Sequence, residues 1–172
     1  EMKTTQNYTL TFVLMLICQI FLSNYTCLGP YILLTMLPTM ILCLPSSMSP
    51  IISMIIAFGC GFATDLLSEG LLGLNTAALL PAAFCRRGII RIFFGDDLIV
   101  RKDCFSIRKN GLAKVSFAQL STCAIFLATY ILLDGAGTRP FWFCVSKFFA
   151  SLACCWALGI VVINILTVDD RK

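Results

Sequence analysis

Apolar residues fill six long runs of the sequence, and polar residues gather in the short segments between them. A helix needs about 20 mostly apolar residues to cross a bilayer; the first run reaches this length only with its flanking residues. Glycine, proline and charged residues separate the runs, which is typical of turns. We therefore expect an all-α integral membrane protein, a six-transmembrane-helix bundle, with approximate spans at residues 8–22, 28–44, 50–67, 71–94, 112–133 and 141–166.

The composition excludes a soluble protein. Of the 172 residues, 59% are hydrophobic and only 13% are charged, whereas a soluble domain has roughly 25% charged residues. A small soluble domain could not bury so much apolar surface. The net charge of +4 is too small a surplus to indicate a nucleic-acid partner. We expect one transmembrane domain over residues 1–172.

The basic residues predict the orientation, because loops rich in Lys and Arg stay in the cytoplasm. Eight of the thirteen lie between residues 86 and 114, and Lys3, Arg171 and Lys172 join them on the same side of a six-span topology. Both termini and a basic loop over 86–111 are thus expected to be cytoplasmic. The loop either anchors the protein to anionic lipid or docks a cytoplasmic partner. Its candidate residues are Arg86, Arg87, Arg91, Arg101, Lys102, Arg108 and Lys109.

Two ionisable residues are expected at membrane depth, where charges are costly and mark functional or structural sites. Asp65 lies near the outer end of the third span and Lys147 in the outer part of the sixth. At 1.5 Å per residue both reach a similar depth in the outer leaflet. We predict that they pair. The alternative is that Lys147 reaches outward to the interface and Asp65 meets water at the end of its helix.

Small residues predict close helix packing. Ala57 with Gly61 and Gly59 with Ala63 are spaced for close backbone approach. The sixth run carries a stripe of small residues at helical spacing, which we interpret as a packing face within the bundle; a polar ligand cavity is the alternative. The stripe consists of Ser146, Ala150, Ala153 and Ala157.

The sequence offers little for catalysis. It contains no histidine, the commonest general base and metal ligand. The ten cysteines include no CxxC pair and lie mostly in apolar runs, so we interpret them as small buried hydrophobes. Asp96, Asp97 and Asp103 lie among basic residues, and no carboxylates converge as metal-assisted or acid–base catalysis requires. We expect a protein that is not an enzyme and holds no metal or cofactor.

One segment resembles a known family. The stretch GCGFATDLLSEGLLGLN over residues 59–75, followed by a basic edge and Asp96-Asp97, places an aspartate near the end of the third span. This pattern, with the length and six runs, resembles the MreD family of rod shape-determining membrane proteins. The residues that carry the resemblance are Asp65, Ser68, Gly70, Gly73 and Asn75.

The resemblance implies a non-catalytic scaffold subunit of the bacterial elongation (rod) complex in the inner membrane, needed for cell shape and for organising lateral peptidoglycan synthesis. Family members bind MreC and share a complex with MreB, RodA and a class B penicillin-binding protein. Their fold is similar to the substrate-binding subunit of energy-coupling-factor transporters, and such a vitamin-transporter subunit is the alternative function. Those subunits dock through an alanine-rich first helix, whereas residues 8–22 contain no Ala or Gly. Self-association and a bound membrane lipid remain open.

Overall fold

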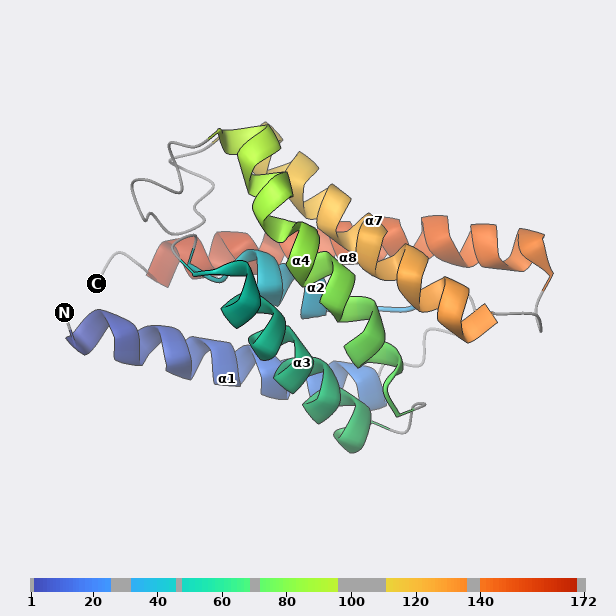
Figure 1. Ribbon diagram of the computed structural model, residues 1–172, viewed down its shortest axis with the longest axis horizontal. Helices are drawn as coiled ribbons and strands as arrows, with labels where there is room; N and C mark the ends of the chain where they lie inside the picture. Colours follow the sequence, from blue (N-terminus) through green and yellow to red (C-terminus); the bar gives the residue numbers. More distant parts are fainter. Residues whose placement is uncertain are drawn as a thin grey trace.

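The chain folds into a bundle of α-helices, seen in a computed structural model (Figure 1). It describes residues 2–25, 32–45, 48–68, 72–95, 111–135 and 140–169, and these contain no β-strand. The helices are α1 (Met2–Tyr25), α2 (Leu37–Leu42), α3 (Pro50–Leu67), α4 (Leu74–Phe94), α7 (Leu112–Gly135) and α8 (Phe141–Asp169).

Local sequence signals set the ends of the central helices. Pro50 occupies the first turn of α3, and the Ser49 side chain accepts a hydrogen bond of 3.3 Å from the backbone N–H of Ile52. Serine is a favoured N-cap because its oxygen satisfies one of the free N–H groups of the first turn. Gly73 (φ +90°) and Gly95 (φ +71°) flank α4, and both adopt a left-handed conformation that costs glycine little.

The second apolar run does not form the single spanning helix expected over 28–44. Residues 32–36 belong to no helix or strand, and Met36 directly before α2 already has helical dihedral angles (φ −98°, ψ −7°). Among the described residues of this run only Leu37–Leu42 is helical. Pro38 lies in the first turn of α2, where proline is tolerated because the N–H it lacks would be unpaired there anyway. In a helix that continued toward the N-terminus, the ring of Pro38 would clash with the carbonyl group four residues earlier, that of Leu34. The expectation is therefore wrong for this run, and proline explains why a helix can begin here but cannot extend backward.

The short helix α2 lies at the centre of the bundle. In space α1 packs on α3, α3 on α4, α4 on α7 and α7 on α8, while α2 contacts all five of these helices. Leu37, Met40 and Ile41 of α2 are fully buried. They join a core to which the surrounding helices contribute residues such as Leu79 and Phe126.

The outside of the bundle is strongly apolar. Large side chains such as Ile55 (65% exposed), Ile92 (78%) and Trp142 (81%) face outward, and apolar surface on this scale is unusual for a soluble monomer. By length and composition α3, α7 and Phe141–Ile165 of α8 could each cross a membrane. The apolar part of α1, Leu10–Tyr25, is shorter, and α4 includes three arginines.

The helix ends form two groups. The beginning of α1, the end of α8, the end of α4 and the beginning of α7 lie toward the same side of the molecule (Figure 1, left). The end of α3 and the beginning of α4 lie toward the other side.

Candidate functional site

Asp65 is the centre of a polar junction between α3 and α4. Its side chain is 2% exposed and accepts hydrogen bonds from the backbone N–H groups of Gly73 (3.1 Å), Asn75 (3.1 Å) and Thr76 (3.0 Å). The Thr76 hydroxyl donates a fourth at 2.7 Å. The first N–H groups of a helix have no partner within the helix and favour negative charge. One carboxylate on α3 thus caps α4.

The other residues that carry the family resemblance surround this junction. Ser68 follows the last turn of α3, and its backbone N–H and its hydroxyl both donate to the carbonyl oxygen of Thr64, at 2.9 and 2.6 Å. Gly73 precedes α4, and Asn75 contributes its backbone N–H to the Asp65 cap. Gly70 lies outside the described residues. The pattern therefore includes a structural unit that joins two consecutive helices.

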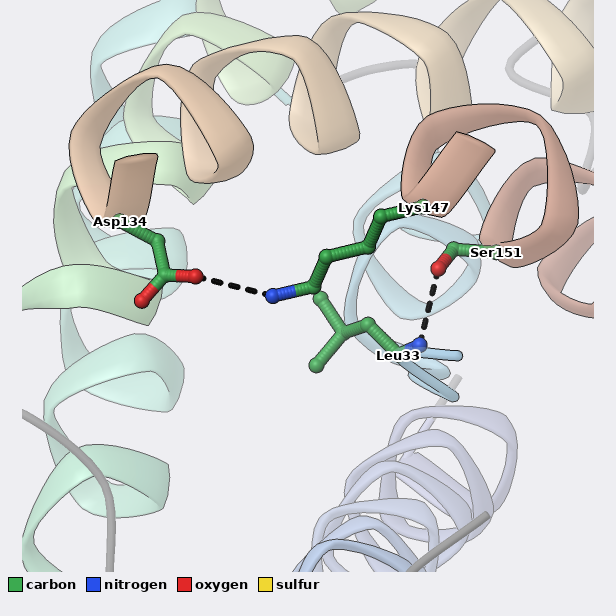
Figure 2. A network of polar contacts seen from close by, with 4 residues as sticks. All are labelled: Leu33, Asp134, Lys147 and Ser151. Atoms are coloured by element: carbon green, nitrogen blue, oxygen red, sulfur yellow. Dashed lines mark hydrogen bonds and ion pairs between the residues drawn. The ribbon is translucent and has the colours of Figure 1, made fainter. Parts of the chain in front are cut away.

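Lys147 does not pair with Asp65, which corrects the prediction from the sequence. Its Nζ lies 2.9 Å from Oδ2 of Asp134, in the last turn of α7 (Figure 2), and 5.7 Å from the centre of the Tyr130 ring. The prediction compared only how deep the two residues lie in the membrane. It did not take into account that α4 and α7 pack between α3 and α8. Each charge has a partner on a neighbouring helix, but not the same partner.

The segment 32–36 is held from one side by α8. The Ser151 hydroxyl accepts a hydrogen bond of 2.8 Å from the backbone N–H of Leu33 (Figure 2). One turn later, Cys155 Sγ accepts from the N–H of Thr35 at 3.4 Å and donates to the carbonyl oxygen of Leu33 at 3.3 Å. Buried backbone groups outside helices and sheets need such partners.

From the other side α1 contributes one side chain. Gln19 is 2% exposed, and its Oε1 accepts a hydrogen bond of 2.6 Å from the backbone N–H of Met36. The Thr35 hydroxyl then accepts from the N–H of Leu37 at 3.2 Å, at the start of α2. Residues from the two ends of the chain thus hold the interrupted second segment in the middle of the bundle.

A neutral polar contact connects α7 to α2. Nε2 of Gln119, which is fully buried, donates to the Thr39 hydroxyl at 2.6 Å and approaches Sγ of Cys123 at 3.2 Å. Gly159 of α8 allows this contact, because a Cβ there would lie 2.2 Å from Nε2 of Gln119 and 2.8 Å from Oγ1 of Thr39. Oε1 of Gln119 has no hydrogen-bond partner among the described residues.

Arg86 is an interior residue of α4 and is not part of an exposed loop as predicted. Its side chain is 3% exposed and donates to the carbonyl oxygens of Leu44 and, at 3.2 Å, Pro45. Nη1 lies 3.5 Å from Oγ of Ser53. Cations are favourable where carbonyl groups end a helix, so Arg86 fixes the end of α2 against α3 and α4.

The other basic residues fall into two groups. Arg87 and Arg91 are exposed on α4. Four more lie outside the described residues, namely Arg101, Lys102, Arg108 and Lys109.

The predicted small-residue stripe faces outward. Ser146, Ala153 and Ala157 of α8 are exposed and Ala150 is half-buried, so the interpretation of the stripe as a packing face within the bundle is wrong. The inner face of α8 instead carries Lys147 and, at successive four-residue steps, the buried Ser151, Cys155, Gly159 and Ile163. Because apolar residues occur all around this helix, the sequence does not indicate which of its faces is buried.

Of the two small-residue pairs on α3, only one packs as predicted. Ala57 and Gly61 are buried, and a Cβ at Gly61 would lie 2.6 Å from Cα of Thr76. Gly59 is exposed, and a Cβ there would meet nothing within 4 Å. The close approach of α3 and α4 at Gly61 is what places Thr76 within reach of Asp65.

The polar side chains inside the bundle form hydrogen bonds with other parts of the protein. All four donors around Asp65 are occupied by its carboxylate, so the group serves as an acceptor for the protein itself. Among the described residues no group of three His, Cys, Asp or Glu side chains could hold a metal ion. The eight described cysteines are free thiols, of which Cys60, Cys123 and Cys155 are buried.

Several interior residues were not predicted from the sequence. Gln19 and Gln119 are long polar side chains inside apolar runs, a signal that marks polar contacts in membrane helices. Ser151 and Cys155 follow Lys147 at four-residue steps, which places them on the same face of a helix. The sequence displays these four polar side chains, but it does not display which groups of residues 33–39 they contact.

Comparisons with protein-family models, with curated proteins and with solved structures find no match for this chain.

Proposed function

We propose that the chain is an inner-membrane protein that crosses the bilayer six times, with both termini in the cytoplasm. Five crossings are helices, and the second is the interrupted segment. Five non-helical residues at no more than about 3.3 Å each and six helical residues at 1.5 Å give at most about 26 Å, close to the roughly 30 Å of a hydrocarbon core. Ser151 of α8 (Figure 2) and Gln19 of α1 accept hydrogen bonds from its backbone, and irregular backbone at membrane depth requires such partners.

Within that membrane we propose the role of a non-catalytic scaffold subunit of the bacterial rod complex that acts by binding MreC. The observation that supports it best is the use of Asp65. This residue lies at the centre of the pattern that resembles the MreD family, and its carboxylate accepts four hydrogen bonds that fix one helix on another. A motif that fixes two consecutive helices against each other suits a protein that holds partner proteins together.

The exposed stripe on α8 supports the same role. Ser146, Ala153 and Ala157 point away from the bundle, and small side chains allow the helix of another protein to approach closely in a membrane. MreC crosses the membrane once, so one helix of MreC would meet this surface. MreB, RodA and the class B penicillin-binding protein would then be reached through the assembly.

Site-specific photocrosslinking in a rod-shaped bacterium tests this proposal. A photoreactive residue at Ala153 or Ala157 of α8 is expected to capture MreC, whereas one at Ala77, an exposed alanine of α4, is expected to capture lipid. Ala77 controls for exposure and residue size. Capture of lipid alone at all three positions would contradict the scaffold role, and capture of MreC at Ala77 only would contradict the choice of surface.

A substrate-binding subunit of a vitamin transporter is the second candidate, and one observation favours it. Transporters often bind their substrates at interrupted helices near the middle of the membrane, and segment 32–36 with α2 is such an interruption. Native mass spectrometry of the protein purified in mild detergent distinguishes the two functions. A small molecule bound at one per chain would favour transport, and MreC retained without one would favour the scaffold.

A further inference from the structure

The last turns of α4 present two arginines to the outside next to an open stretch of backbone. Arg87, Gly88 and Arg91 are exposed, although their neighbour Arg86 is turned into the core. Phe84 (64% exposed) and Ile92 (78%) lie on the same outer surface. The charged part of this helix therefore borders directly on apolar side chains.

Helical spacing arranges these residues into one surface. Arg87 and Arg91 are four residues apart and lie one above the other, and Phe84 lies one turn before them. A Cβ built on Gly88 would meet no atom of the described residues within 4 Å. Two exposed arginines thus lie beside an exposed part of the backbone, with an aromatic ring on the side toward the middle of the helix.

We propose that this surface binds an anionic phospholipid. Its phosphate would lie over Gly88 between the guanidinium groups of Arg87 and Arg91, and its acyl chains would follow Phe84 toward the middle of the bundle. Guanidinium groups bind phosphate oxygens through paired N–H donors, and each has five donors, so a further contact of Arg91 within the protein leaves donors for the lipid.

The position on the molecule agrees with the chemistry. This end of α4 lies toward the side where α1 begins and α8 ends (Figure 1), which is the cytoplasmic side in the proposed topology. Anionic lipid headgroups attract basic residues at that surface. The inference requires that the chain lies in a bilayer, but it does not depend on the scaffold role and would stand if MreC were not the partner.

Native mass spectrometry of the purified full chain tests the charge requirement. Phosphatidylglycerol is added in parallel with phosphatidylcholine of the same acyl chains, and preferential binding of phosphatidylglycerol is expected. In R87Q/R91Q its affinity should fall about ten- to thirty-fold, as expected for losing two basic residues at the membrane surface. K114Q removes a charge from an exposed lysine of α7 and should weaken binding less than R87Q or R91Q alone.

A second pair of variants tests the shape of the surface while keeping both arginines. Gly88→Phe covers the backbone between them, whereas Gly59→Phe introduces the same ring at an exposed glycine of α3 that is equally open. The preference for phosphatidylglycerol should disappear in the first and persist in the second. The proposal is overturned if K114Q weakens binding as much as R87Q or R91Q alone, if Gly88→Phe leaves the preference intact, or if the unaltered chain binds both lipids equally.

Discussion

The α3–α4 junction and the segment 32–36 provide acceptors for buried backbone N–H groups in two different ways. In both regions backbone N–H groups lie inside the bundle without helical partners. At the junction a single carboxylate, Asp65, serves four donors that follow it within eleven residues. At segment 32–36 neutral side chains such as Gln19 and Ser151 serve one donor each, across sequence separations of 17 and 118 residues.

The difference teaches how stability is distributed in this bundle. A charged acceptor makes stronger hydrogen bonds than a neutral one, and its removal leaves several buried donors unpaired at once. At segment 32–36 the loss of one side chain leaves only one donor unpaired. We therefore expect the junction to be sensitive to one substitution and segment 32–36 to tolerate single changes better. The effects of single substitutions on the free energy of unfolding in detergent should follow this difference.

The largest effect is expected for Asp65→Ala. It leaves three backbone N–H groups and the Thr76 hydroxyl without their acceptor, and should lower the free energy of unfolding by about 3–5 kcal/mol. Asp65→Asn keeps one acceptor oxygen and should lose roughly half of that. The measurement is unfolding in mixed detergent followed by circular dichroism. A loss for Asp65→Ala no larger than that for Ser68→Ala would contradict the assignment of the cap.

The next effect concerns the close approach that places Thr76 near Asp65. Gly61→Ala puts a Cβ 2.6 Å from Cα of Thr76, so the backbones must separate, at a cost of about 1–3 kcal/mol. Gly59→Ala on the same helix meets nothing and should be neutral or slightly stabilising, because alanine favours helix.

The corresponding glycine near α2 sharpens this test. Gly159→Ala meets the movable end of the Gln119 side chain and the Thr39 hydroxyl, so it should cost less than Gly61→Ala. Equal losses at both positions would mean that the two regions are equally rigid, and the comparison would fail.

A smaller effect is expected for Ser151→Ala, which leaves the N–H of Leu33 without its acceptor. A single buried donor left unpaired costs about 1–2 kcal/mol. Ser121→Ala is the matched control, since that hydroxyl donates to its own helix at Phe117 and its loss should change stability by less than about 0.5 kcal/mol. If the two serine variants were equally stable, the role of α8 in holding segment 32–36 would be disproved.

The smallest effect is expected for the ion pair of Lys147 and Asp134, whose side chains are 12% and 20% exposed. Partly exposed pairs contribute about 0.2–1 kcal/mol. In a double-mutant cycle, Lys147→Met should show a coupling energy of this size with Asp134→Asn and none with Asp65→Asn. A coupling to Asp65 alone would restore the pairing that the sequence suggested.

The sequence by itself determined where most helices lie. The apolar runs and the turn residues between them predict α3 over its full length. Ser49 and Pro50 begin this helix through local capping. The end of α4 at Gly95 is equally local. The small-residue spacing of Ala57 and Gly61 also predicted a true close contact. Such features depend on neighbours within a few residues, which a sequence displays directly.

Only the tertiary structure decided which faces meet and which charges pair. The helices are apolar on the inside and on the outside, so the hydrophobic pattern that reveals the buried face of a soluble helix is weak here. Asp65 therefore capped the next helix instead of pairing with Lys147, Arg86 turned inward, and the stripe on α8 turned outward. Partners that lie a hundred residues apart become neighbours only when the helices assemble.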